Sequence, residues 1–339
     1  MTSRELVYRT LEHKNTDGRA PRDLWIMPWA HLHYPTETAA IIDAFPSDFD
    51  CPPAMFSAVS TVEQGDPYAV GEYVDAWGCT FVNMQAGIIG EVKKPLITGE
   101  DWRDTSQVVF PEFCLDFDVE KVNRFCAATD QFVRVDGGVR PFERLQFIRG
   151  TEDLYMDLMD PPAGFWDFVE RLHDYNCRIT EKWAQTDVDA ITYMDDWGSQ
   201  KSLLISPQMW RTYFKPMYRD YIDIAHRHGK KIFMHSDGYI LDILPDLIDL
   251  GLDAVNTQLF CMGVDKLAPF KGEITFWGEI CRQHILPEGT PETVRQAVTQ
   301  VYDTLWQDGG CIAQCEFGPG AKPENVAAVF EVWNGLTGR

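Results

Sequence analysis

The chain has 339 residues, of which 45% are apolar and 13% aromatic, and its formal net charge at neutral pH is −22. This composition can fill one large core, so we expect a single domain over residues 1–339. A surface of this charge repels nucleic acids and anionic membranes, which excludes both as partners.

The sequence also indicates a compartment. The N-terminal segment lacks the apolar stretch of a signal peptide, and no apolar run approaches the roughly 18 residues that span a bilayer. The nine cysteines form no C-x-x-C pair and no short disulfide framework. We therefore expect a cytoplasmic protein whose cysteines are reduced.

The first half of the chain has the less regular pattern. A capping box that starts at Thr2 begins a first helix. Two strands are predicted at Leu24–Trp29 and Phe132–Asp136, with an insertion between them that contains a hairpin near Thr80–Glu91. A further, weak strand is predicted at Arg144–Ile148.

The second half alternates short β-rich runs with helical patterns. Its predicted strands are Asp189–Asp195, Lys231–His235, Ala254–Thr257, Thr275–Gly278 and Cys311–Cys315. Its predicted helices run from Ser206 to Gly229, around Ile240–Leu250, onward from Thr290, and onward from Pro323.

Strands that alternate with helices of this length are typical of parallel strands joined by crossover connections. About eight strands favour a (β/α)₈ TIM barrel with an N-terminal helical and hairpin extension over an open, doubly wound sheet. The absence of a glycine-rich phosphate loop from the sequence also argues against a Rossmann fold.

In such a barrel the active site lies at the C-terminal ends of the strands, where polar residues recur in this sequence. We predict catalytic roles for Asp195, Asp196 and Glu316. We predict substrate contacts for Trp29, His31, Tyr193, Trp197, Gln200, Asn256, Gln258 and Trp277. The alternative is that the polar residues are ordinary loop residues and that the aromatic ones pack between barrel and helices.

The most specific pattern is His235-x-Asp237. Extended residues two apart point to the same side, and imidazole and carboxylate are good zinc ligands. A third ligand from another strand, with Cys315 the best candidate, would leave one coordination position open for substrate. In the alternative interpretation His235 bonds within a loop, Asp237 caps the next helix and Cys315 is a core residue.

Several segments resemble the signatures of the uroporphyrinogen decarboxylase superfamily, which includes cobalamin-dependent methyltransferases. They are VDAWGC from Val74, DDWGSQKSLLISPQMW from Asp195, KIFMHSDGYILDILPDLIDLGLDAVNTQ from Lys231, FWGEICRQHILPEGTPETV from Phe276, and CEFGPGAKPENV from Cys315. The resemblance covers nearly the whole chain and implies the barrel fold.

The resemblance also implies a branch of the superfamily. Uroporphyrinogen decarboxylases carry an arginine-bearing segment after the first strand, where this chain reads PWAHLHYP from Pro28, with no arginine. The methyltransferases hold zinc through H-x-C and a later cysteine, which implies His235 and Cys315 as ligands, with Asp237 in place of the first cysteine. A carboxylate leaves more Lewis acidity on zinc than a thiolate, which suits an ether oxygen.

The sequence is therefore similar to enzymes that demethylate methoxylated or N-methylated small molecules. The resemblance implies Zn²⁺ as a cofactor and a partner corrinoid protein that carries cobalamin and accepts the methyl group. It leaves a homodimer open. Two alternatives stand beside it: a metal-free decarboxylase, and a non-catalytic protein that uses the barrel to bind a ligand.

Overall fold

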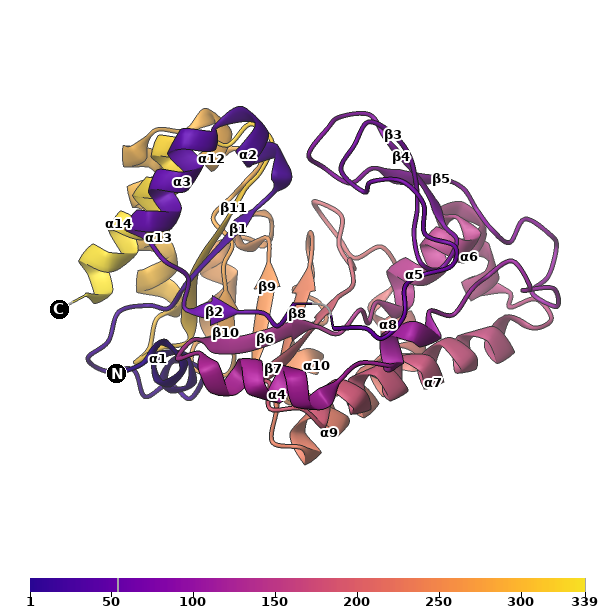
Figure 1. Ribbon diagram of the computed structural model, residues 1–339. Helices are drawn as coiled ribbons and strands as arrows, with labels where there is room; N and C mark the ends of the chain where they lie inside the picture. Colours follow the sequence, from indigo (N-terminus) through magenta and orange to yellow (C-terminus); the bar gives the residue numbers. More distant parts are fainter. Residues whose placement is uncertain (54, 339) are drawn as a thin grey trace.

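The computed structural model describes residues 1–53 and 55–338. Within these ranges, eight parallel strands form a nearly closed barrel in the hydrogen-bonded order β1-β11-β10-β9-β8-β7-β6-β2 (Figure 1). The strands are β1 (Arg22–Ile26), β2 (Phe49–Asp50), β6 (Phe132–Asp136), β7 (Ala190–Met194), β8 (Lys231–Ser236), β9 (Ala254–Thr257), β10 (Thr275–Trp277) and β11 (Cys311–Phe317). The predicted (β/α)₈ TIM barrel is confirmed.

Helices surround the barrel. They are α1 (Ser3–Leu11), α2 (Pro28–His33), α3 (Pro35–Ala44), α4 (Val119–Ala128), α5 (Pro141–Arg149), α6 (Thr151–Met159), α7 (Phe165–Ala184), α8 (Pro207–Tyr213), α9 (Lys215–Arg227), α10 (Leu244–Asp249), α11 (Leu259–Met262), α12 (Ile285–Glu288), α13 (Pro291–Leu305) and α14 (Pro323–Thr337). Two short 3₁₀ helices span Glu112–Leu115 and Val264–Phe270. In the part of the chain that the structure describes, no helix is both long and apolar enough to cross a membrane.

Apolar side chains fill the barrel toward the N-terminal ends of the strands. This interior cluster comprises Val7, Leu11, Phe49, Phe132, Ala190, Phe233, Ala254, Trp277 and Ile312. Its first two members come from α1, which begins with the predicted capping box of Thr2 and Glu5. Helix α1 therefore closes the N-terminal mouth of the barrel, and any ligand must enter from the opposite end.

Along each strand, side chains alternate between the inside and the outside of the barrel. On β8, Phe233 belongs to the interior cluster, so His235 lies on the same inward face. On β11, Ile312 faces inward, and the same face continues to Glu316. Cys315 has the opposite parity and packs in the apolar layer between the barrel and its helices.

A separate antiparallel sheet is inserted between β2 and β6. It consists of β3 (Gly71–Val74), β4 (Thr80–Asn83) and β5 (Glu91–Lys94), so the predicted hairpin is confirmed as β4 and β5. Figure 1 places this sheet on the side toward which β8 and β9 point. An ion pair of 2.5 Å between Asp75 and Arg144 of α5 attaches it to the barrel.

Two predicted elements are wrong. Arg144–Ile148 lies inside helix α5, whose first residue is Pro141, and the strand that completes the barrel is instead the two-residue β2. The predicted helix from Ser206 to Gly229 is divided into α8 and α9. The division falls just before Pro216, which has no N–H to donate to the preceding turn.

We predict that Leu11→Ala lowers the free energy of unfolding by about 2–5 kcal/mol, because it leaves a void where α1 packs into the barrel. Leu32→Ala on α2 is the matched control, since that side chain is 61% exposed and its truncation should cost less than about 0.5 kcal/mol. Urea unfolding followed by circular dichroism measures both. Equal losses would contradict the role of α1 as a plug.

Candidate functional site

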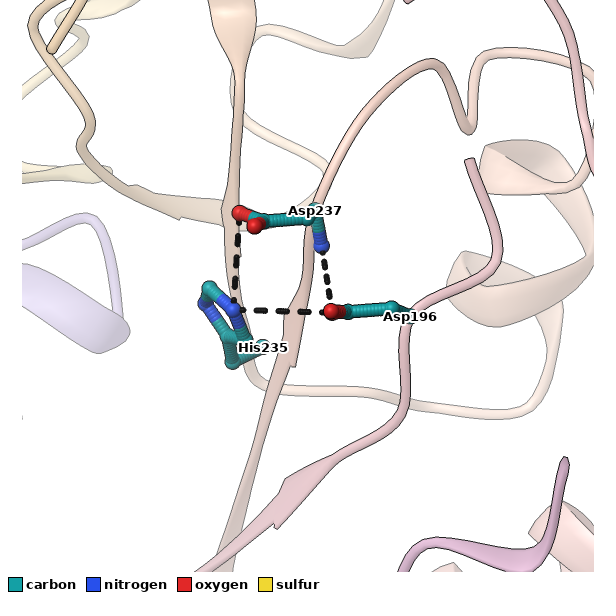
Figure 2. Close-up of side chains that lie close together, drawn as sticks. All are labelled: Asp196, His235 and Asp237. Carbon is teal, nitrogen blue, oxygen red and sulfur yellow. Dashed lines mark hydrogen bonds and ion pairs between the residues drawn. The ribbon is translucent and has the colours of Figure 1, made fainter. Parts of the chain in front are cut away.

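Three potential metal ligands meet at the C-terminal mouth of the barrel: Asp196, His235 and Asp237 (Figure 2). Their ligand atoms lie within 4.8 Å of one another. The Nε2 atom of His235 is 3.6 Å from Asp196 Oδ1 and also 3.6 Å from Asp237 Oδ1. The register explains the meeting, because Met194 of β7 pairs with His235 of β8 and both aspartates lie two residues further on.

The orientation of the His235 ring is set by Asn256 on β9. The Asn256 side-chain amide donates to the Trp277 carbonyl, so its Oδ1 is left to accept from His235 Nδ1 at 2.6 Å. With Nδ1 turned to Asn256, Nε2 is the ring nitrogen that faces the two aspartates. The three side chains thus offer one ligand atom each to a metal ion, while Asp196 Oδ1 also accepts from the Asp237 backbone N–H at 2.9 Å.

Asp237 is also held from its other side. Its Oδ2 atom is in contact with the guanidinium of Arg282, which bonds Glu316 at 2.9 Å as well. Its Oδ1 atom is 3.4 Å from the amide of Gln258, which in turn accepts from Gln200 at 2.8 Å. The predicted residues Gln200, Gln258 and Glu316 therefore belong to one network with the candidate metal ligands.

A cavity of about 880 Å³ lies between the barrel mouth and the β3–β5 sheet, and both Asp196 and Asp237 line it. Of the described residues that line it, three are arginines: Arg140, Arg144 and Arg282. Each is paired with a carboxylate, namely Glu143 at 3.2 Å, Asp75 at 2.5 Å, and Asp237. A substrate with several carboxylates would find these guanidinium groups already engaged.

Two glutamates lie beside this site: Glu279 is buried and Glu143 is partly buried. Burial, reinforced by neighbouring carboxylates, raises the pKa of Glu143 to about 8 and that of Glu279 to about 8, against the pull of nearby arginines. Glu279 is 2% exposed, and its Oε2 atom has no hydrogen-bond partner among the described residues. Burial therefore favours the protonated form of Glu279 at neutral pH, whereas Glu143 is paired with Arg140.

The structure does not bring Cys315 to the predicted metal site. Its side chain is fully buried on the outward face of β11, and burial raises the pKa of its thiol far above the ordinary value. The inward positions on either side of it belong to Gln314 and Glu316. Asp196, predicted as a catalytic residue, lies where the third ligand was expected.

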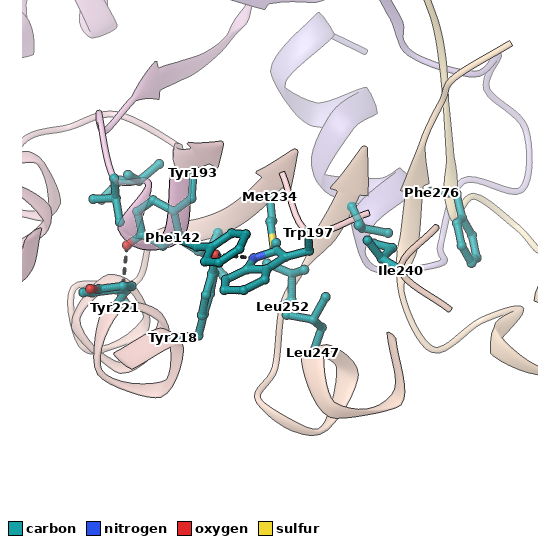
Figure 3. Close-up of a cluster of buried hydrophobic side chains, with 14 of the residues drawn as sticks. Phe142, Tyr193, Trp197, Tyr218, Tyr221, Met234, Ile240, Leu247, Leu252 and Phe276 are labelled. Carbon is teal, nitrogen blue, oxygen red and sulfur yellow. Dashed lines mark hydrogen bonds between the residues drawn. The ribbon is translucent and has the colours of Figure 1, made fainter. Parts of the chain in front are cut away.

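Asp195, Tyr193 and Trp197 also lie outside the barrel. Tyr193 and Trp197 belong to the buried cluster drawn in Figure 3, and Asp195 bonds Tyr218 of the same cluster. The Asp195 carboxylate accepts from the backbone N–H of Phe142 and Glu143 at the start of α5 and from the Tyr218 hydroxyl. Burial raises the pKa of Asp195 to about 7. These contacts are those of a helix cap in a packed layer, and they correct the expected placement at the mouth.

Tyr193 and Trp197 were predicted to contact substrate, but in the structure they bond to residues of the surrounding helices. The Tyr193 hydroxyl donates to Thr180 of α7, and the Trp197 indole donates to the Tyr218 hydroxyl. Phe142 stacks on the Trp197 ring with centroids 4.4 Å apart. Both side chains are fully buried, as expected if these aromatic residues pack between the barrel and its helices.

The remaining predicted contacts are dispersed. Strand β1 ends at Ile26, earlier than expected, and Trp29 is buried in α2 while His31 is exposed on it. Trp277 lies in the barrel interior, where its indole donates to Asp23. The described lining of the large cavity does not include Trp29, His31 or Trp277.

Arg282 is the site residue that the sequence analysis missed. It lies five residues after the end of β10, in a loop whose course the sequence does not specify. The other site residues lie at strand ends, which the sequence pattern marks, whereas a loop residue has no such pattern.

The family model described as Uroporphyrinogen decarboxylase (URO-D) matches residues 73–336. The chain belongs to this family. No curated protein matches the sequence significantly.

Among solved structures, a methyltransferase from Methanosarcina mazei aligns over 99% of this chain and 99% of its own, with 14% identity and a TM-score of 0.66. At this identity the likeness establishes a shared fold. An endo-β-1,4-xylanase from Gloeophyllum trabeum aligns less well, over 96% of this chain and 99% of its own, with 11% identity and a TM-score of 0.44.

We predict that Glu279→Gln flattens the pH dependence of stability. Because the native pKa of Glu279 is raised to about 8, the native protein binds a proton that the unfolded chain has released above about pH 4.3. Its contribution therefore makes the free energy of unfolding fall as pH rises between about 4 and 8. Glutamine keeps the size of the side chain and removes this titration.

Urea unfolding of the metal-free protein at several pH values measures the effect. The variant should gain stability relative to the wild type as pH rises from about 5 to 8. The same substitution at exposed Glu120 on α4 is the matched control. Parallel curves for wild type and Glu279→Gln would refute the prediction.

Proposed function

We propose that the protein is a metal-dependent methyltransferase that moves a methyl group from a methoxylated or N-methylated small molecule to a corrinoid protein. The observation that carries this proposal is the convergence of Asp196, His235 and Asp237 beside a large cavity. The family membership and the fold shared with a methyltransferase support it. A cytoplasmic location and a cobalamin-bearing partner are part of the proposal.

The three side chains fit a divalent metal. One imidazole nitrogen and two carboxylate oxygens are donors that zinc accepts, and three protein ligands leave a position for substrate. Asn256 fixes His235 with Nε2 toward the two aspartates, as hydrogen-bonded histidine ligands require. Bound zinc would supply Lewis acidity toward the heteroatom that carries the methyl group.

The remaining residues would bind and orient the donor. Gln200 and Gln258 lie on the cavity wall next to Asp237 and offer amide donors and acceptors to its polar groups. In the reaction the bond between methyl carbon and heteroatom breaks and its electron pair stays on the heteroatom. A reduced corrinoid carried by the partner protein would supply the electron pair for the new bond to the methyl carbon. An oxygen leaving group then takes up a proton from the solvent.

A metal-free decarboxylase is the second candidate, because the family model carries that description. The paired arginines of the cavity argue against a substrate with many carboxylates. Bound metal separates the two candidates.

We predict about one zinc per chain in protein purified without chelator. Asp196→Ala, His235→Ala and Asp237→Ala should each lose most of it, because each removes one of three donors. Cys315→Ala should retain it, because that thiol faces away from the site. Metal analysis by mass spectrometry, with circular dichroism as a check of folding, measures this. Loss of zinc from Cys315→Ala but not from Asp196→Ala would assign the ligands differently.

The activity is tested anaerobically with reduced corrinoid protein and a panel of methoxylated and N-methylated donors. We expect methylation of the corrinoid, seen in its absorption spectrum, and its loss in His235→Ala. A parallel assay with uroporphyrinogen should give no decarboxylated product. Decarboxylation by metal-free protein would replace this proposal with the second candidate.

A further inference from the structure

We propose that Arg282 is a positioning residue that aligns Asp237 for metal binding. This inference rests on the metal site of the proposed function. The Arg282 guanidinium contacts Asp237 Oδ2, while Oδ1 of the same carboxylate lies 3.6 Å from His235 Nε2. One oxygen is thus held by the arginine, and the other faces the point where the candidate ligands converge.

The guanidinium is itself fixed in place. Its Nη1 atom bonds Glu316 Oε2 at 2.9 Å, and its Nε atom lies 3.7 Å from Glu279 Oε1. Glu316 belongs to β11, so the arginine connects the end of that strand to Asp237 beyond β8. A planar guanidinium with several donors in fixed directions can hold two carboxylates at once, whereas an ammonium group cannot set their directions.

Two physical effects of Arg282 on metal affinity have opposite signs. Its positive charge repels a metal ion nearby, so Coulomb's law alone predicts tighter metal binding when the charge is removed. Its contact with Asp237 already restricts the carboxylate before the metal binds, so less conformational freedom is lost on binding. Positioning therefore predicts weaker metal binding when the Arg282 side chain is removed. The sign of the change in affinity therefore identifies which effect dominates.

The test is the zinc affinity of metal-free protein, measured by competition with a chelating dye. For Arg282→Gln we expect the Kd for zinc to rise about 10- to 100-fold. Arg140→Gln is the matched control, because Arg140 lines the same cavity but pairs with Glu143 rather than Asp237. Its Kd should stay the same or fall, since it loses only a repelling charge. Arg282→Lys, which retains the charge, should still bind zinc more weakly than the wild type.

Chemical rescue gives a second readout. Two smaller cavities, of about 210 and 420 Å³, also border Arg282, so removal of its side chain leaves room for a free guanidinium ion. Non-denaturing guanidinium chloride should lower the Kd of Arg282→Ala for zinc, and sodium chloride at equal concentration should not. A residue that acts only through packing would not be rescued in this way.

Zinc binding by Arg282→Gln as tight as that of the wild type would overturn the positioning role, as would equal rescue by both salts. Wild-type protein that binds no zinc would overturn the metal site and this role together. If the zinc affinities of the Arg282 and Arg140 variants change as expected but no methyl transfer is found, the proposed reaction is overturned and the role of Arg282 stands.

Discussion

The alternation of side chains along the barrel strands decides which groups can meet at the mouth. Asp196, His235 and Asp237 share the inward phase on β7 and β8, and the register of these strands brings them together. Asp195 and Cys315 are one residue out of phase and belong to the layer beneath the helices. A shift of one residue in β7 would bring Asp195 inward in place of Asp196, and one in β11 would bring Cys315 inward in place of Glu316. The apolar packing below the site therefore fixes its chemistry.

Much of the second half could be predicted from the sequence, because its strands are buried, bounded by turn residues and followed by capped helices. The pair His235 and Asp237 follows from the same two-residue period. The strand β2 could not be predicted, since two residues carry no periodicity. The phase of β11 can be read from its alternation, because Gln314 and Glu316 share one face and Cys315 lies on the other, apolar face. The prediction of Cys315 as a ligand rested instead on its position at the strand end and on the family resemblance.

The cavity wall carries arginines although the protein as a whole is strongly acidic. The chain carries a net charge of −22, yet its cavity arginines are all held by carboxylates among the described lining residues. Each pair fixes a part of the wall: Arg144 attaches the β3–β5 sheet through Asp75, and Arg282 connects Asp237 with Glu316. The arginines therefore shape the cavity rather than offer free positive charge to a ligand.

The packing of α1 against the N-terminal end of the barrel constrains the order in which the protein can fold during its synthesis. The Thr10 carbonyl accepts from the N–H of Gly310, and the Asn15 N–H donates to the carbonyl of Asp308, just before β11. Helix α1 is thus synthesised long before its partners Asp308 and Gly310. The N-terminal end of the barrel can close only after these residues are made, and until then the apolar face of α1 lacks these partners.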